Sequence, residues 1–308
     1  MEREFDELTL KKYTDSIDSN PGNKGLYTSL VQLCAKLGQY DVGIYYFSHA
    51  IEMFPHDEFF YVGLSNLYFE SGNDEKAIDV FKKSLLSYPD NINFRYNLFE
   101  LYRRLGKFKE AIKISPDKKT FYKEVFDYAK EKNNYEEAFD VYITAIKMRP
   151  AMKEPYEHLL MLSKHLGQYD KAVEILQYAI RHHSNNKDIY NYIYELACLS
   201  NNFEFAIIEF RELIRLNIRD DIAHHFLEET LKKSGDYEYA IKIYTELIKE
   251  LSDYIELYKS LSKFYLLLPD KEKSCAFFEQ CLQKFPREQV FYINYSNLLY
   301  SLGKYDKA

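Results

Sequence analysis

A small residue returns every 34 positions along most of this 308-residue chain, and only one step departs from the period, with 27 residues. Because each of these residues is Gly, Ala or Ser, no side chain larger than a hydroxymethyl group occupies the position. Small side chains at a fixed long spacing predict helices that cross closely once in each repeat. The repeated positions are Gly43, Ala77, Ala111, Ala138, Ala172, Ala206, Ala240, Ser274 and Ala308.

Two further columns place the ends of the helices. A turn-forming residue stands five positions before each small residue, where Gly or Asn tolerates the left-handed backbone that follows a helix. An acid stands two positions before eight of the nine small residues, where it complements the positive end of a helix. Each small residue therefore lies in the first turn of a helix, and the turn residue ends the preceding one. The turn column is Gly38, Gly72, Gly106, Asn133, Gly167, Asn201, Gly235, Pro269 and Gly303.

Aromatic residues and prolines complete the repeated pattern. An aromatic residue stands three positions before seven of the nine small residues, and Pro follows four of them by twelve positions. A tyrosine column, sixteen positions before the small residue, comprises Tyr27, Tyr61, Tyr122, Tyr156, Tyr190, Tyr258 and Tyr292, which we interpret as packing residues. Taken together, these columns resemble the tetratricopeptide repeat, from about Lys24 to Ala308.

The resemblance implies an all-α fold: a right-handed α-α superhelical solenoid of about eight to nine helix hairpins, whose first helices line a concave groove. The hairpin that starts at Ile92 is shortened, and the last is truncated. Residues 1–23 are expected to form a leftover second-type helix that caps the array of residues 24–308. The repeats start at Lys24, Glu58, Ile92, Lys119, Lys153, Lys187, Asp221, Ile255 and Gln289.

The composition of the chain limits which kinds of partner and which cellular compartments we expect. The net charge is −7, and no dense Lys/Arg cluster indicates a nucleic-acid partner. No apolar run is long enough to span a membrane, and the N-terminus has no apolar segment typical of a signal peptide. The four cysteines have neither ligand spacing nor a disulfide framework, so we expect a reducing, cytoplasmic location. They are Cys34, Cys198, Cys275 and Cys281.

Catalytic motifs are missing from the sequence. It has no glycine-rich phosphate loop, no HExxH, no paired CxxC and no nucleophile elbow. His158 and His165 lie seven positions apart on one helix face, but no third metal ligand is evident beside them. We therefore expect surface histidines, no cofactor, no metal and no enzyme activity.

The resemblance places partner-binding residues on the first helix of each repeat. The corresponding side chains are aromatic near the N-terminus and mostly acidic in the middle of the chain. We expect them to bind an extended protein or peptide segment that carries Lys or Arg, with the acids steering it. Alternatively, the acids form a solvated helix face that Lys130, Lys164, Lys232 and Lys233 neutralise. The candidate residues are Phe59, Asn66, Tyr96, Asn97, Glu100, Asp127, Glu157, Asn191, Glu195 and Glu229.

Two specialised subfamilies fit poorly. Co-chaperones of this family grip a chaperone's C-terminal carboxylate with Lys, Arg and Asn side chains. Asn66 and Asn97 match that pattern, whereas Val62, Thr120 and Glu124 stand at its cationic positions. The asparagine ladder of the O-GlcNAc transferase arm is also missing.

The 27-residue step lies between Ala111 and Ala138, and it removes about two helical turns. Pro116 predicts that the helix beginning near Lys109 stops early. The deletion either bends the solenoid and opens a notch near residues 115–119, or it is absorbed by local repacking.

The sequence ends in the first turn of a helix, so we expect it to be part of a longer protein. One hypothesis is a stand-alone adaptor or scaffold made wholly of repeats. The other is the recognition arm of an enzyme or regulator whose working domain follows residue 308. Self-association through the terminal repeats is a third option.

Overall fold

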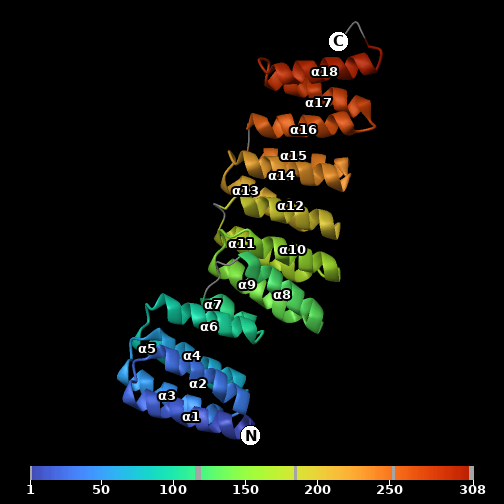
Figure 1. Ribbon diagram of the computed structural model, residues 1–308. Helices are drawn as coiled ribbons and strands as arrows, with labels where there is room; N and C mark the ends of the chain where they lie inside the picture. The colour runs from blue at the N-terminus through green and yellow to red at the C-terminus, as the bar shows by residue number, and fades with distance from the viewer. Residues whose placement is uncertain (1, 115–118, 184–185, 252–253, 305–308) are drawn as a thin grey trace. The chain divides into compact units, whose positions relative to one another are not determined.

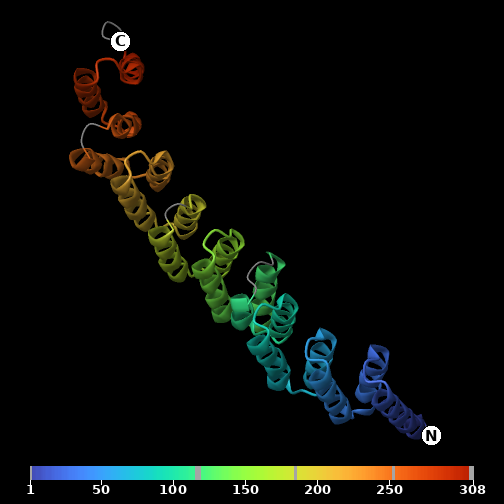
Figure 2. The ribbon, with the colours of Figure 1, turned by 90° about the vertical axis from the view of Figure 1, so that its left-hand side faces the viewer.

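A computed structural model describes residues 2–114, 119–183, 186–251 and 254–304, and within these ranges all regular structure is α-helical (Figure 1). The chain forms two compact units, Met1–Arg149 and Pro150–Ala308. Within each unit, consecutive helices run side by side as hairpins joined by short turns (Figures 1 and 2). The predicted all-α fold of stacked helix hairpins is confirmed.

In the first unit, the first-type helices α2, α4 and α6 contact one another in sequence order. The N-terminal helix α1 packs along α2, and its Leu10 and Ile17 join the buried cluster around Tyr27. The helices are α1 (Glu2–Ser19), α2 (Lys24–Leu37), α3 (Tyr40–Met53), α4 (Glu58–Glu70), α5 (Asp74–Ser87), α6 (Ile92–Arg104), α7 (Phe108–Ile114), α8 (Lys119–Lys132) and α9 (Tyr135–Met148).

In the second unit, α10 contacts α12, and α12 contacts α14, so the first-type helices again form a layer. The second-type helices α11, α13, α15 and α17 pack against their hairpin partners. The helices are α10 (Glu154–Leu166), α11 (Asp170–His182), α12 (Asp188–Ser200), α13 (Glu204–Leu216), α14 (Asp221–Ser234), α15 (Tyr237–Leu251), α16 (Ile255–Leu267), α17 (Lys271–Lys284) and α18 (Gln289–Ser301).

The column of small residues lies where helices approach most closely. The Ala and Ser members from Ala77 to Ser274 are each at most 1% exposed. A Cβ added to Gly43 would lie 3.0 Å from the side chain of Leu67. Larger side chains at these positions would force the helices apart. The last member, Ala308, lies outside the described residues.

The turn column adopts the predicted left-handed backbone, with φ between +51° and +79° at the Gly and Asn members. Gly38, Gly167, Asn201 and Gly235 directly follow their helices. Pro269 is the exception in the turn column, because proline cannot adopt positive φ. The residue before it, Leu268, is extended, with φ −64° and ψ 143°.

The 27-residue step shortens one helix, as the sequence predicts. Helix α7 has only seven residues and ends at Ile114. It packs directly on α9, and its buried Phe108 contacts the rings of Phe121 and Tyr128. The expected notch, residues 115–119, lies outside the described residues except for the backbone of Lys119.

The tyrosine column has a second role besides packing. The hydroxyl of Tyr61 donates a hydrogen bond to the carbonyl of Pro55 at 2.9 Å, and Tyr156 and Tyr292 each donate to the proline six residues earlier at 3.1 Å. Each bond ties a first-type helix to the turn that precedes it. This accounts for tyrosine rather than phenylalanine at these three positions of the column.

A buried acid joins α14 to α16. Glu228 is 7% exposed and accepts hydrogen bonds from Lys263 at 2.8 and 2.9 Å, and it pairs with Lys232 at 2.7 Å. Burial by itself would raise the pKa of Glu228, but the hydrogen bonds from the two lysines outweigh it and lower the pKa below the usual value.

We predict that Gly63→Ala destabilises the first unit by about 1–3 kcal/mol. Gly-to-Ala changes inside helices usually stabilise by about 0.5–1 kcal/mol. Here the new Cβ would lie 1.9 Å from the ring of Phe47, which is 1% exposed and cannot move aside. Urea unfolding followed by circular dichroism measures the effect. Phe47→Leu should partly rescue the Ala variant, and a stabilised Gly63→Ala protein would contradict this packing.

We predict that Glu228→Gln lowers stability by about 2 kcal/mol at neutral pH, because two lysines lose their charged acceptor. Since the folded-state pKa is lowered from 4.5, the contribution is present above that pH and is lost as the pH falls through the folded-state value. The difference in unfolding free energy between wild type and variant should therefore shrink in acid. Glu174→Gln, at an exposed carboxylate on α11, is the control. A difference that is independent of pH would contradict the assignment.

Candidate binding surface

Four carboxylates of the second unit gather around one tyrosine. Glu154 and Glu157 come from α10, and Asp188 and Glu195 come from α12, which packs beside it (Figure 1). We call these four side chains, together with Tyr156 and Tyr192, the α10–α12 acidic surface. Glu154 and Asp188 stand in the first turns of their helices, where acids complement the helix dipole.

All four carboxylates affect the pKa of Tyr192. Its pKa is raised, first by burial and then by Glu157, Asp188, Glu195 and Glu154. The side chain is 6% exposed, and its ring stacks on Tyr156 with centroids 4.9 Å apart and planes 5° apart. The Tyr192 hydroxyl forms no hydrogen bond with any described residue.

Two of the four carboxylates lack a cation. Asp188 pairs with Lys153 at 3.1 Å, across two half-exposed side chains. Glu157 and Glu195 are exposed, and neither forms an ion pair within the described ranges of the chain. Glu195 accepts a hydrogen bond from the Asn191 amide at 2.6 Å, which is a neutral partner. Lys164, which the sequence suggests as a neutralising residue, forms no ion pair with a described residue.

The candidate acid Glu229, on α14, does pair with a lysine. Glu229 is bound by Lys232 at 3.1 Å, and the same lysine pairs with Glu228. One of the four lysines proposed to neutralise the acids therefore does so. Among the candidate acids of the second unit, Glu157 and Glu195 are therefore the two that form no ion pair with a described residue.

In the first unit, the candidate acid Glu100 already has a cation. Arg103 donates two hydrogen bonds to Glu100, at 2.7 and 3.0 Å, and one to Glu124 of α8 at 2.9 Å. These bonds raise the pKa of Arg103 and join α6 to α8. Arg103 was missed in the sequence because it lies outside the helix positions that the family assigns to the groove.

The other candidates of the first unit are dispersed. Phe59 is half-buried against Phe47, at 6.0 Å between ring centroids, so much of its ring belongs to the core. Tyr96 is 47% exposed and Asp127 is exposed. The Asn97 amide donates to the carbonyl of Asn93 at 2.9 Å. Asn66 is half-buried, and its side chain has no hydrogen-bond partner among the described residues.

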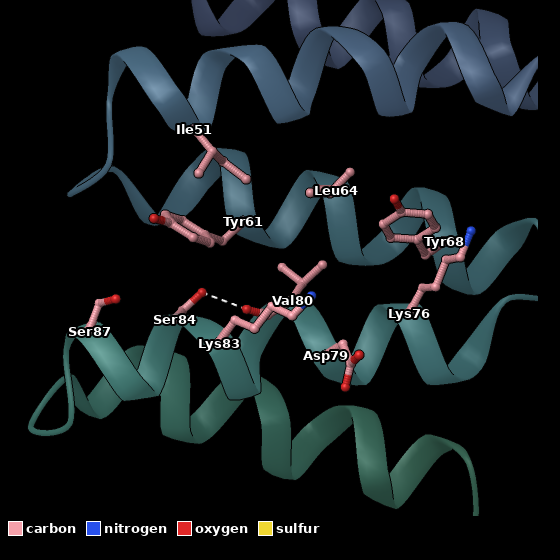
Figure 3. Close-up of a pocket in the computed structure, with 10 residues that line it drawn as sticks. All are labelled: Ile51, Tyr61, Leu64, Tyr68, Lys76, Asp79, Val80, Lys83, Ser84 and Ser87. Carbon is pink, nitrogen blue, oxygen red and sulfur yellow. Dashed lines mark hydrogen bonds between the residues drawn. The ribbon is translucent and has the colours of Figure 1, made fainter.

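A cavity lies where the sequence indicates no site. It has a volume of about 550 Å³ and is lined by α3, α4 and α5. In Figure 3, Tyr61 and Leu64 face Val80, and Lys76 lies beside Tyr68. Tyr61, which the sequence predicts to be a packing residue, is 8% exposed and also lines this cavity.

Two segments match family models of the tetratricopeptide repeat, residues 60–91 and residues 223–253. The chain contains tetratricopeptide repeats in these two segments. No curated protein sequence matches it. Tetratricopeptide repeats are typical of proteins that bind other proteins.

Solved structures with a similar course of the chain include tetratricopeptide repeat proteins. Yeast Tom70 is 14% identical, with 99% of this chain and 86% of that chain covered and a TM-score of 0.30. A tetratricopeptide repeat protein from Parabacteroides merdae ATCC 43184 is 16% identical, with 94% and 99% covered and a TM-score of 0.26. MamA from MSR-1 is 17% identical, with 51% and 95% covered and a TM-score of 0.29.

Neither a metal site nor a membrane-spanning helix is found among the described residues. No three His, Cys, Asp or Glu side chains in this part of the chain are grouped closely enough to hold a metal ion. His158, one of the histidines noted in the sequence, places its Nδ1 2.8 Å from the carbonyl of Glu154. No helix in the described ranges is long and apolar enough to cross a membrane.

We predict that neutralising the acidic surface stabilises the second unit. The combined Glu157→Gln and Glu195→Gln changes should raise the unfolding free energy by about 0.3–0.5 kcal/mol, because the like-charge repulsion that they remove exceeds the helix-dipole stabilisation that Glu157 provides in the first turn of α10. Added salt should raise wild-type stability and reduce the effect of both changes. Glu250→Gln is the control, because Arg215 donates to that carboxylate at 2.6 and 2.8 Å and its loss should not stabilise. Destabilisation by the Glu157 and Glu195 changes, measured by urea unfolding, would contradict this electrostatic interpretation.

Proposed function

We propose that this chain is a non-catalytic protein-binding scaffold whose α10–α12 acidic surface binds an extended segment of another polypeptide that carries Lys or Arg. One observation supports the proposal most strongly: four carboxylates raise the pKa of the nearly buried Tyr192, and two of them, Glu157 and Glu195, form no ion pair with a described residue. The role at this surface is the same whether the chain is a stand-alone adaptor or the recognition arm of a larger enzyme or regulator.

The chemistry of the surface suits a cationic side chain better than a neutral or acidic one. An ammonium or guanidinium group between Glu157 and Glu195 would reduce the repulsion among the four carboxylates. Tyr192 is 6% exposed and stacks on the fully buried Tyr156, so the rings hold the surface rigid rather than offering contact area to the stem of Lys or Arg. The unpartnered hydroxyl of Tyr192 and the amide of Asn191 are within the same surface and are able to bind the main chain of an extended segment.

The charge of the surface is expected to act on recognition more than on the final affinity. Opposite charges speed encounter and exclude acidic partners, and both effects weaken as ionic strength rises. Glu229, already bound by Lys232, contributes less than Glu157 and Glu195. In the first unit, Glu100 would exchange Arg103 for a partner's cation at a cost, so we place the main contact on the second unit.

We also propose a reducing compartment, the cytoplasm, as the place of action. All four cysteines are unpaired, and Cys34 and Cys281 are buried. Burial raises the pKa of both buried thiols, to about 12 for Cys281, so these thiols remain protonated at neutral pH.

Charge reversal tests the proposed function. The full chain is titrated against an array of extended peptides whose Lys/Arg and Asp/Glu content varies, and affinity is measured by fluorescence anisotropy at several salt concentrations. We expect Lys- or Arg-containing peptides to bind, and Glu157→Lys/Glu195→Lys to weaken binding by more than about tenfold, or about 1.4 kcal/mol.

The matched control is Glu70→Lys/Glu174→Lys, which changes the net charge equally at exposed acids outside the surface. It should bind nearly as the wild type does. Affinity that is indifferent to salt, or that falls equally in both double variants, would show that the α10–α12 acidic surface does not recognise the segment.

A further inference from the structure

A second, smaller pocket lies in the first unit, between α1, α2 and α3. Its volume is about 190 Å³, and we call it the aromatic pocket. Six of its eight lining positions recur 34 residues later as lining residues of the larger cavity in Figure 3. The repeat geometry therefore creates a pocket at the same position in both repeats. The side chains that differ between the repeats determine which ligand each pocket is able to bind. The aromatic pocket is lined by Ile17, Asp18, Pro21, Tyr27, Tyr45, Tyr46, His49 and Met53.

The aromatic pocket and the larger cavity differ in charge and in the number of aromatic residues that line them. At three corresponding positions, the aromatic pocket has Tyr45, Tyr46 and His49, whereas the larger cavity has Asp79, Val80 and Lys83. The larger cavity is also lined by Lys76. Among the described residues that line the aromatic pocket, none is Lys or Arg, and the carboxylate is Asp18. The aromatic pocket is thus suited to a cation, and the larger cavity is not.

Three aromatic side chains form a corner at the mouth of the pocket. The rings of Tyr45 and Tyr46 lie with centroids 5.3 Å apart and planes at 87°. His49 stacks on the outer Tyr45 ring at 5.8 Å, with planes 10° apart. Tyr45 is 61% exposed, so this corner is open to a partner. Perpendicular rings present two walls to one small cation, which is the arrangement that aromatic cages use.

The acid beside the rings retains free acceptor capacity. The Tyr46 hydroxyl donates to Asp18 Oδ2 at 3.3 Å, a long bond for two oxygens. Asp18 is exposed, and its second carboxylate oxygen accepts no hydrogen bond from a described residue. His49 lies 3.4 Å from Glu52, so a protonated His49 has its own counter-charge.

Tyr27, at the base of the pocket, differs from three other members of the tyrosine column. Tyr61, Tyr156 and Tyr292 donate to a proline carbonyl six residues earlier. The corresponding residue for Tyr27 is Pro21, yet the Tyr27 hydroxyl is fully buried and has no hydrogen-bond partner in the described part of the chain. A buried hydroxyl without a partner is costly, so this position is not optimised for packing alone.

We propose that the aromatic pocket binds the methylated ammonium group of a lysine side chain on a partner polypeptide. An unmodified ammonium has three N–H donors that need acceptors, and the pocket supplies one carboxylate, so desolvation would be poorly compensated. Trimethylation removes all three donors and keeps the positive charge. The aromatic faces attract that charge, and Asp18 balances it. The site is separate from the α10–α12 acidic surface and does not depend on it.

Calorimetry with three matched peptides tests the proposal on the full chain. The peptides share one sequence and carry at a single position trimethyllysine, lysine, or the neutral tert-butyl isostere of trimethyllysine. We expect the trimethyllysine peptide to bind at least about tenfold more tightly than the other two, as a cation–π contact requires. Tyr45→Ala and Asp18→Asn should each weaken its binding by about five- to tenfold.

Two controls separate this site from the others. Lys83→Ala changes the corresponding position of the larger cavity and should leave binding of the trimethyllysine peptide unchanged. The Glu157→Lys/Glu195→Lys variant, in which binding of cations at the α10–α12 acidic surface is weakened, serves as a second background. The preference for trimethyllysine over lysine should persist in it, so failure of the proposed function would not be mistaken for failure of this site. Circular dichroism verifies that the exposed Tyr45→Ala and Asp18→Asn variants are folded.

Three results would overturn the proposal: no binding of the trimethyllysine peptide at millimolar concentration, equal binding of the neutral isostere, or unchanged binding by both Tyr45→Ala and Asp18→Asn. Equal binding of the isostere would identify an apolar pocket rather than a cation site.

Discussion

The close crossing of helices at one small side chain per repeat is the constraint on which the structure depends. Ala77, Ala172 and Ala240 are each fully buried, so the partner helix approaches within the reach of a methyl group. This approach brings first-type helices into one layer and keeps α10 against α12. The α10–α12 acidic surface exists because that contact places carboxylates from two helices around one tyrosine. Repeat proteins generally gain stability from such neighbouring interfaces.

The fold could be predicted from the sequence because its determinants are local and periodic. Gly38 and Asn201 have positive φ, and Pro269 follows an extended residue, as their chemistry requires. The charge pairing could not be predicted in this way, because it depends on side-chain direction between helices. Arg103 reaches from α6 to Glu124 of α8, and Glu228 gathers lysines from α14 and α16. The spacing indicates candidate acids but does not show that Glu100 is paired while Glu157 and Glu195 are not.

The repeats also show how one backbone geometry provides different chemistry. The tyrosine column ties helices together through its hydroxyls at Tyr61, Tyr156 and Tyr292, whereas Tyr27 has no such bond. The larger cavity beside this column is lined by Lys76 and Lys83, whereas the aromatic pocket, one repeat earlier, is lined by tyrosines and a histidine. Periodicity predicts where these hollows occur. The side chains at the non-periodic positions, such as Tyr45 and Lys83, determine their character.

Backbone hydrogen exchange is the most direct test of the central claim that α10 and α12 together receive a cationic segment. The exchange rates of the full chain are compared with and without a bound Lys- or Arg-containing peptide. We predict that slowed exchange is concentrated in Glu154–Leu166 and Asp188–Ser200. Slowed exchange confined to other helices, with α10 and α12 unchanged, would contradict the claim.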